Sequence, residues 1–176
     1  MRNFFAKGSG QEEVRSQLPG IYPRLWRFSL SLSGDRNSAD DLAQATSARA
    51  LEHAEKFQAG TSLAAWLFTM ARRIWLNEKR AERIRGAGGL VSIDEFELPS
   101  PEADAEMNTF ARQVLKQVMA LPEAQRSTVV LVYVEGYTYR EASEVLGIPI
   151  GTVMSRLAAA RTKLQTAQEQ RKTGLR

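Results

Sequence analysis

The chain has 176 residues, 43% of them hydrophobic, no cysteine and a formal net charge of +4. This length suffices for one good core or two small ones. The absence of cysteine excludes a disulfide framework and a Cys-based zinc site. No apolar run approaches the ~20 residues that span a bilayer. Residues 1–8 lack the hydrophobic stretch of a signal peptide, so we expect a soluble, cytoplasmic protein with no membrane insertion.

The charge is divided sharply along the chain. Residues 1–86 carry 14 Lys and Arg against 9 Asp and Glu, residues 87–108 carry six acidic residues and no basic one, and residues 109–176 carry 10 basic residues against five Glu. Two basic blocks suit two contact sites on one nucleic acid. A solvated surface is the alternative interpretation of each block.

Three or four helices are predicted in the first basic block, and three of them have definite bounds. The first, over about 11–33, and the third, over about 62–85, repeat apolar residues at helical spacing. The second runs over about 38–56, and Ser38 offers it a side-chain oxygen as an N-cap. A loop over 57–62 precedes the third helix.

The acidic segment is rich in glycine and proline. This composition is typical of a linker with little regular structure, so we predict a flexible acidic linker over 87–107. It joins a domain over 1–86 to a second domain over 108–176. The residues that mark the linker are Gly86, Gly88, Gly89, Pro99, Ser100 and Pro101.

The second domain is also predicted to be helical, which makes the fold class all-α. Leu121-Pro122 separates helices over about 104–120 and 123–134. Two further helices follow, over about 139–146 and 150–164. No internal repeat is present.

The last two helices have the spacing of a helix-turn-helix. Gly147 suits the sharp turn because glycine adopts positive φ without penalty, and Pro149 fixes φ just before a helix can start. In such a motif the second helix enters the major groove of DNA, whereas an ordinary helical hairpin is the alternative. Its apolar face consists of Val153, Leu157, Ala160 and Leu164. The opposite face, which we predict to reach bases and phosphates, consists of Thr152, Ser155, Arg156, Ala159 and Lys163.

The third helix alternates aromatic and basic residues, and the loop before it contains Gly60. Aromatic rings stack on unpaired bases while Arg and Lys follow phosphates, so this pattern suits single-stranded DNA. The alternative is a solvated basic face, with Trp66 in the core and Trp75 either buried or exposed. The polar and basic residues of the helix are Arg72, Arg73, Asn77, Lys79, Arg80, Arg83 and Arg85.

Asp40 and Asp41 stand near the predicted start of the second helix. Their ordinary role is a favourable interaction with the N-terminal helix dipole, and Asp41 also follows Ser38 at the spacing of a capping-box variant. His53, the only histidine, is interpreted as structural at the core edge. No phosphate loop, metal-ligand set or nucleophile–base pair is present in the sequence, so we predict neither an enzyme nor a cofactor nor a metal site.

In this order and spacing, the motifs resemble the extracytoplasmic-function class of bacterial RNA polymerase sigma factors. The likeness covers about 11–85 and 108–165. In the first block it rests on Gly34-Asp35 with Ala39–Gln44, and on Phe57–Leu63 with Ala65–Phe68. In the second block it rests on Leu121-Pro122, Gln125-Arg126, Glu135–Glu141 and Gly151–Leu157.

The resemblance implies a protein that binds core RNA polymerase and promoter DNA under the control of an anti-sigma factor. The first domain would bind the clamp helices of the largest polymerase subunit through Asp40, Asp41 and Gln44, and open the −10 element. The second would read the −35 element with helix 150–164. The residues assigned to −10 recognition and melting are Gly60, Arg72, Arg73, Asn77, Arg80 and Arg83.

Two departures from the family pattern stand out. After Gln44 the chain has Ala45-Thr46-Ser47 where the family has an acidic residue, Thr and a bulky apolar residue. The first helix of the reading domain has Ala142-Ser143 in place of Ile-Ala. Alternatives are a plain helix-turn-helix regulator, which leaves the Trp/Arg helix unexplained, and a sigma-like decoy that captures an anti-sigma factor.

Overall fold

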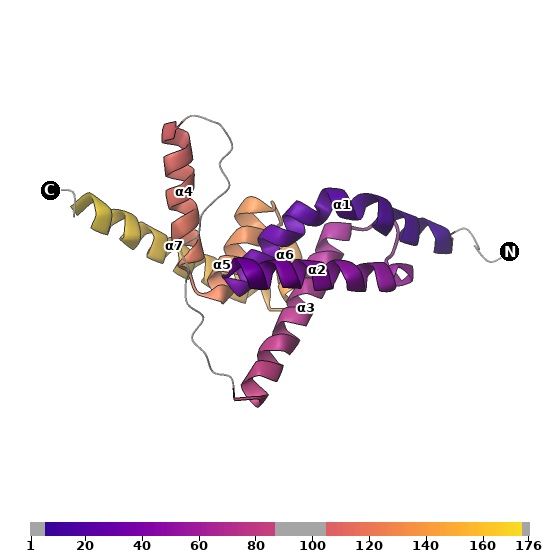
Figure 1. Ribbon diagram of the computed structural model, residues 1–176. Helices are drawn as coiled ribbons and strands as arrows, with labels where there is room; N and C mark the ends of the chain where they lie inside the picture. Colours follow the sequence, from indigo (N-terminus) through magenta and orange to yellow (C-terminus); the bar gives the residue numbers. More distant parts are fainter. Residues whose placement is uncertain (1–5, 87–104, 174–176) are drawn as a thin grey trace. The chain divides into compact units, whose positions relative to one another are not determined.

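The computed structural model describes residues 6–86 and 105–173, with side chains over 10–86 and 111–166. The described helices fall into two compact units, one in the first half of the chain and one in the second. Every regular element within the described ranges is helical, which confirms the all-α prediction (Figure 1). The first unit contains α1 (Ala6–Ser33), α2 (Arg36–Glu52), the 3₁₀ turn η1 (Ala54–Lys56) and α3 (Leu63–Ile84). The second contains α4 (Ala105–Met119), α5 (Glu123–Val129), the π-helical turn η2 (Val130–Val134), α6 (Tyr139–Leu146) and α7 (Ile150–Thr173).

The core of the first unit lies where α1, α2 and the first half of α3 meet. The rings of Phe28 on α1 and Phe68 on α3 are 4.7 Å apart at their centroids, and both side chains are fully buried. Leu25, Leu42 and Leu67 complete this cluster from the three helices. The last turns of α3, after Trp75, are largely exposed, so this end of the helix leaves the core and is open to a partner (Figure 1).

The start of α2 differs from the sequence prediction. The N-cap is Asp35, whose carboxylate accepts the backbone N–H of Ser38 at 2.7 Å, so the prediction of Ser38 as the cap was wrong. Gly34, with φ of 79°, ends α1 and leaves Asp35 in the extended conformation that an N-cap requires. This bond lowers the pKa of the Asp35 carboxyl below its ordinary value. The first turn of α2 therefore carries no acidic residue, and the helix-dipole interpretation of Asp40 and Asp41 was also wrong.

The second unit contains the predicted helix-turn-helix. Thr138 and Glu141 form a capping box at the start of α6, and Gly147 ends α6 in the left-handed conformation with φ of 54°. The carbonyl of Pro149 then accepts the N–H of Thr152 at 2.9 Å, which begins α7. Fully or nearly fully buried apolar side chains hold the helices together, namely Leu131, Ala142, Leu146, Val153, Leu157 and Ala160.

The connection between α4 and α5 is fixed by a buried arginine. The guanidinium of Arg126 donates to the carbonyl of Met119 at 3.0 Å and to that of Leu121 at 3.3 Å, and it lies near Glu123. The Met119 carbonyl belongs to the end of α4, where a helix leaves its last C=O groups without partners, and the Leu121 carbonyl belongs to the connection that follows. Burial lowers the pKa of Arg126 below its ordinary value.

The α4 helix begins at Ala105, inside the segment predicted as linker, whereas residues 87–104 of that segment lie outside the described residues.

Within the described part of the chain, no helix is both long and apolar enough to span a membrane.

Candidate nucleic-acid interface

The helix α7 brings its five predicted DNA-reading residues to one side. Positions 152, 155, 156, 159 and 163 share a face because an α-helix has 3.6 residues per turn. Val153, Leu157 and Ala160 on the other side are buried. Along the reading face, Ser155, Ala159 and Lys163 are exposed, and Thr152 and Arg156 are half-buried. The buried side anchors the helix to its unit, and the reading face lies away from this anchor.

The start of α7 is also accessible to a phosphate. Gly151 is exposed, and a Cβ built on it would meet no atom within 4 Å. Unpaired N–H groups at a helix N-terminus attract anions. The helix runs on to Thr173, well past the predicted end at 164.

The predicted residues on α3 fall on two lines rather than one. Arg73, Asn77 and Arg80 follow one side of the helix, at spacings of four and three residues. Arg72 and Arg83 are eleven residues apart and follow a second side of the helix. This side lies about 90° from the first, because each residue of an α-helix turns by about 100°. The first line borders a groove.

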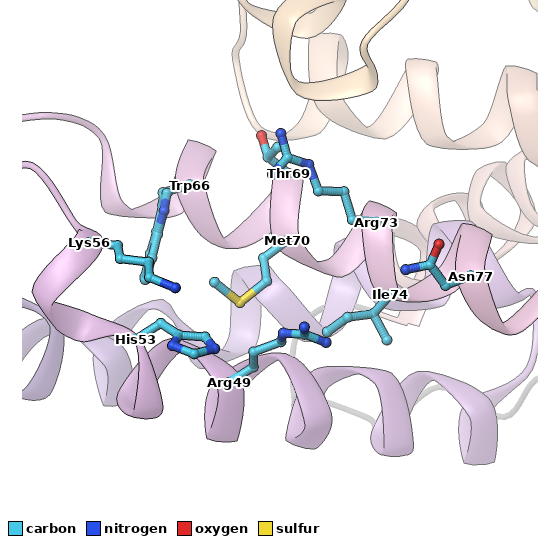
Figure 2. A pocket seen from close by; sticks show the side chains of 9 residues that line it. All are labelled: Arg49, His53, Lys56, Trp66, Thr69, Met70, Arg73, Ile74 and Asn77. Carbon is cyan, nitrogen blue, oxygen red and sulfur yellow. The ribbon is translucent and has the colours of Figure 1, made fainter.

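This groove lies between the end of α2, η1 and the middle of α3, and has a volume of about 310 Å³. In Figure 2, Met70 and Ile74 point from α3 toward Arg49 and His53. Trp66 and Lys56 lie at one end of the groove and Asn77 at the other. The residues lining it are Arg49, His53, Lys56, Trp66, Thr69, Met70, Arg73, Ile74 and Asn77. The lining thus combines basic side chains, one aromatic ring and an apolar floor.

Of the two tryptophans and the histidine that the sequence singles out, Trp66 is placed differently from its prediction, and Trp75 takes one of its two predicted positions. Trp66, expected in the core, is half-buried in the groove wall, with its ring 5.4 Å from that of Phe57. Trp75 is the buried one, and the Lys79 ammonium lies 4.6 Å from its ring centroid. His53 is half-buried, and its side chain, which is 38% exposed, also lines the groove.

Sequence reasoning missed Arg49 and Lys56 as part of this surface. Both are basic and seven residues apart, a spacing that would put them on one side of the helix predicted over 38–56, although Arg49 lies on α2 and Lys56 in η1. That signal was present in the sequence. Their relation to Trp66 and Arg73 follows only from the packing of α2 on α3.

The loop before α3 lies far from the basic end of that helix. Gly60 is exposed with φ of 79°, and its N–H donates to Oε2 of Glu13 at 3.2 Å. Ser62 then caps α3 by accepting the N–H of Ala65 at 3.2 Å. With a rise of 1.5 Å per residue, the start of α3 and Arg83 are about 30 Å apart. The groove occupies the space between the loop and the basic end.

A separate acidic surface is formed by α2. Asp40, Asp41 and Gln44 are all exposed, while Ala39, Leu42, Ala43 and Thr46 of the same helix are buried. The Asp40 carboxylate accepts the indole N–H of Trp26 on α1. Asp41 lies close enough to Glu78 of α3 to help raise its pKa, after desolvation and the neighbouring Glu82.

The two departures from the family pattern are accommodated locally. Ala45 is exposed, and the Ser47 hydroxyl donates to the carbonyl of Ala43 at 2.8 Å within α2. Ala142 is fully buried in the second unit, and the Ser143 hydroxyl donates to the carbonyl of Arg140 at 2.7 Å. Neither substitution leaves the helices without their packing.

Comparisons with known proteins match both units. The family model for sigma-70 region 2 matches residues 21–84, and the model for sigma-70 region 4 matches residues 111–164. The sigma factor EcfG of Rhodopseudomonas palustris is 35% identical over 155 residues, which are 87% of this chain and 83% of that protein. The sigma factor SigL of Mycobacterium tuberculosis is 35% identical over 149 residues, 82% of this chain and 83% of that protein.

Solved structures agree with this assignment. The sigma factor RpoE of Bartonella quintana, solved with the anti-sigma factor NepR, has a TM-score of 0.73 and 28% identity over 90% of this chain and 98% of that chain. CnrH, solved with the cytosolic domain of CnrY, has the same fold, with a TM-score of 0.60 and 23% identity over 93% of this chain and 92% of that chain. The chain therefore belongs to the extracytoplasmic-function class of RNA polymerase sigma factors.

Proposed function

We propose that the two helical units of this sigma factor divide promoter recognition between them. As a sigma factor, the protein binds core RNA polymerase and directs promoter-specific transcription initiation. The groove between α2 and α3 receives the opened −10 element, and α7 reads the −35 element. The observation that carries this division is the groove itself, because it joins Trp66 to the basic side chains of Arg49, Lys56 and Arg73.

The groove has the chemistry of a site for unpaired bases. The half-buried ring of Trp66 offers a stacking surface, and its contact with Phe57 keeps it in place. Arg49, Lys56 and Arg73 supply positive charge for phosphates, and the amide of Asn77 both donates and accepts hydrogen bonds. Arg80 extends this surface along α3, and the exposed turn at Gly60 lies in the loop that precedes the helix. Arg72 and Arg83 lie on the second line of α3 and act on phosphates outside the groove.

The reading face of α7 suits the major groove of duplex DNA. Thr152, Ser155 and Arg156 lie on its N-terminal half, which is the part of a recognition helix that contacts base edges. Ala159 is small and exposed, so the helix backbone approaches DNA closely beside it. Lys163, one turn later, contacts a phosphate. The accessible start of α7 at Gly151 adds a second phosphate contact.

The acidic surface of α2 is the polymerase-binding site in this scheme. Asp40, Asp41 and Gln44 are exposed together on a helix whose other side is buried, so their side chains are available to a partner. Asp41 lies near the acidic Glu78 of α3, which adds to the negative charge of this surface. Clustered carboxylates of this kind favour a basic partner surface, because opposite potentials attract across an interface.

We also infer control by an anti-sigma factor and a location in the cytoplasm, where RNA polymerase acts. Support for the first comes from RpoE of Bartonella quintana, which was solved with its anti-sigma factor and is 28% identical to this chain over 90% of its length. An anti-sigma factor that covers either the groove or the reading face prevents promoter binding.

Run-off transcription with core RNA polymerase and a library of promoters tests the proposal. We expect promoter-specific transcripts that depend on this protein. Transcripts should be lost when the groove is altered by Arg73→Ala together with Lys56→Ala, although core binding persists. A plain regulator gives no transcript with core polymerase alone, and a decoy binds an anti-sigma factor without giving transcripts. Either outcome contradicts the proposed function.

A further inference from the structure

The start of α1 touches the segment that leads into the loop 57–62. A Cβ built on Gly10 would lie 2.6 Å from the carbonyl oxygen of Phe57 and 3.8 Å from that of Ala54. A real Cβ does not approach an oxygen this closely, and here the obstacle is backbone. Gly10 therefore allows α1 to pack directly against the main chain of this segment.

A second contact joins α1 to the loop itself. Oε2 of Glu13 accepts the N–H of Gly60 at 3.2 Å, across 47 positions of sequence. The other carboxylate oxygen, Oε1, accepts the side-chain amide of Gln17 at 3.1 Å, one turn further along α1. Both oxygens of Glu13 are thus engaged, and Gln17 orients the carboxylate toward the loop.

Gly60 is present for its backbone conformation rather than for space. Its φ is 79°, a region that residues with a Cβ rarely adopt, yet a Cβ at this position would meet no atom within 4 Å. In this conformation the N–H of Gly60 points to Glu13. A bond to a carboxylate is among the stronger hydrogen bonds in proteins, so it favours this shape of the loop over others.

The same contacts reach the wall of the groove. Phe57, whose carbonyl faces Gly10, is 5% exposed, and its ring lies 5.4 Å from that of Trp66. Trp66 in turn lines the groove. The position of α1 therefore fixes both the loop and the aromatic ring beside it.

We propose that Glu13 is a positioning residue for promoter opening, holding the Gly60 turn in the shape that receives the unpaired strand, with Gly10 allowing the close approach of α1. The inference rests on the proposed function of the groove. Glu13 itself touches no DNA in this scheme. Its effect passes through the backbone of the loop and through Phe57 to Trp66.

The test compares three variants of the whole chain. Glu13→Ala removes the acceptor, whereas Glu13→Gln keeps an amide oxygen for the Gly60 N–H and is the conservative rescue. Glu12→Ala is the matched control, because Glu12 is the exposed acidic neighbour on the same turn of α1. Hydrogen exchange of the Gly60 amide, measured by NMR on the free protein, reports on the loop without polymerase or DNA.

We expect Glu13→Ala to speed exchange of the Gly60 amide about tenfold, the size of effect of one hydrogen bond to a charged group. In complex with core polymerase, the same variant should slow open-complex formation, measured by permanganate reactivity of −10 thymines. Core affinity and closed-complex binding should stay at the level of the unaltered protein. Glu12→Ala should resemble the unaltered protein in all of these measurements, and Glu13→Gln should lie between the unaltered protein and Glu13→Ala, because a neutral amide oxygen accepts a weaker bond than a carboxylate.

Three results overturn the inference. The first is Gly60 exchange in Glu13→Ala equal to that of the unaltered protein. The second is faster exchange with unchanged promoter opening, which shows that the held loop shape is not needed. The third is a parallel loss of core affinity and opening, which shows a general effect on the fold. If the unaltered protein opens no promoter, the proposed function fails instead, and that result is seen before any variant is compared.

Discussion

The indole N–H of Trp26 on α1 donates a hydrogen bond to the carboxylate of Asp40 on α2. The guanidinium of Arg36 lies over the same indole ring, 5.7 Å from its centroid. Asp40 is thus fixed by its own unit, whereas Asp41 beside it lies near the acidic Glu78. Two adjacent carboxylates of one surface therefore differ in what they do for the fold.

This difference predicts separate effects of two substitutions around Asp40. Trp26→Phe keeps an aromatic ring but removes the donor, and should lower the free energy of unfolding by about 0.5–1.5 kcal/mol, the net contribution of one hydrogen bond. Asp40→Asn keeps an oxygen that accepts the indole N–H, so the free energy of unfolding should change less, while the affinity for core polymerase falls. Urea unfolding measures the first quantity and titration with core polymerase the second. Equal stability of Trp26→Phe and the unaltered protein contradicts a structural role for this bond.

At Asp41, charge reversal should affect binding and leave the fold intact. Asp41→Lys should weaken core polymerase binding about tenfold or more, since close charge pairs at interfaces contribute ~1.5 kcal/mol or more. It also places a positive charge near Glu78, whose pKa is raised by desolvation, Glu82 and Asp41, so the free energy of unfolding should not fall. Glu52→Lys, an equal charge change at the exposed end of α2, is the control. Unchanged core affinity of Asp41→Lys, with an unchanged circular dichroism spectrum, contradicts the assignment.

The two lines of basic residues on α3 should contribute unequally to strand opening. Replacing Arg80 and Arg83 by Ala together should impair open-complex formation more than closed-complex binding. Arg80→Ala should account for most of the effect, because Arg80 continues the line of Arg73 and Asn77 that borders the groove. Removing one side chain that neutralises a phosphate of single-stranded DNA lowers the salt dependence of binding by about 0.7 in the log–log slope. Permanganate footprinting with each variant measures strand opening. Normal thymine reactivity in the double variant contradicts the role of this helix.

Local sequence patterns predicted the helices well and their long-range contacts poorly. The apolar spacing of α3 was sufficient to place that helix. The apolar spacing of α7 and the turn at Gly147 were sufficient to place a helix-turn-helix, since both depend on neighbours in sequence. The cap of α2 was misplaced because Ser38 and Asp35 both have capping side chains, and only the position of Gly34 decides between them.

The groove and the Glu13 contact show where sequence reasoning stops. Arg49 and Trp66 come together only through the packing of α2 on α3, and Glu13 meets Gly60 across 47 residues.

The run of β-branched and aromatic residues at 129–134 is helical and ends in the π turn η2, because the surrounding tertiary packing overrides β propensity there. Tyr133 is thereby exposed and accepts a hydrogen bond from Arg161.

The cap of α2 predicts a specific dependence on pH. The bonds from Ser38 hold the pKa of Asp35 below its ordinary value of 3.8, so the charged form is favoured by folding. Its contribution is present above the unfolded pKa and is lost as the pH falls through the lower folded pKa. Asp35→Ala should cost about 1 kcal/mol of unfolding free energy at pH 7. The difference between Asp35→Ala and the unaltered protein should shrink in urea unfolding below pH 3.8, and a constant difference contradicts this cause.

The reading face of α7 predicts two kinds of effect from two basic residues. Arg156 lies in the N-terminal half of the helix and is half-buried, whereas Lys163, seven residues later, is exposed. Arg156→Ala should cost ~1–3 kcal/mol of binding free energy and relax preference at one −35 position, as expected for an arginine that contacts a guanine in two places. Lys163→Ala should weaken binding to all sequences about equally and lower the salt slope by about 1.

Arg161→Ala is the matched control for these two variants. Arg161 lies on the side of α7 away from the reading face, and its guanidinium donates to the hydroxyl of Tyr133 at 3.1 Å. Its replacement removes the same charge from the same helix. Because Arg161 lies away from the reading face, base preference should stay unchanged. Binding of all three variants to every single-base change in the −35 element, at two salt concentrations, separates a base contact from a phosphate contact. If Arg156→Ala lowers affinity uniformly and preserves base preference, Arg156 contacts a phosphate, and the base contact has to be sought at Thr152 or Ser155, which share its half of the helix.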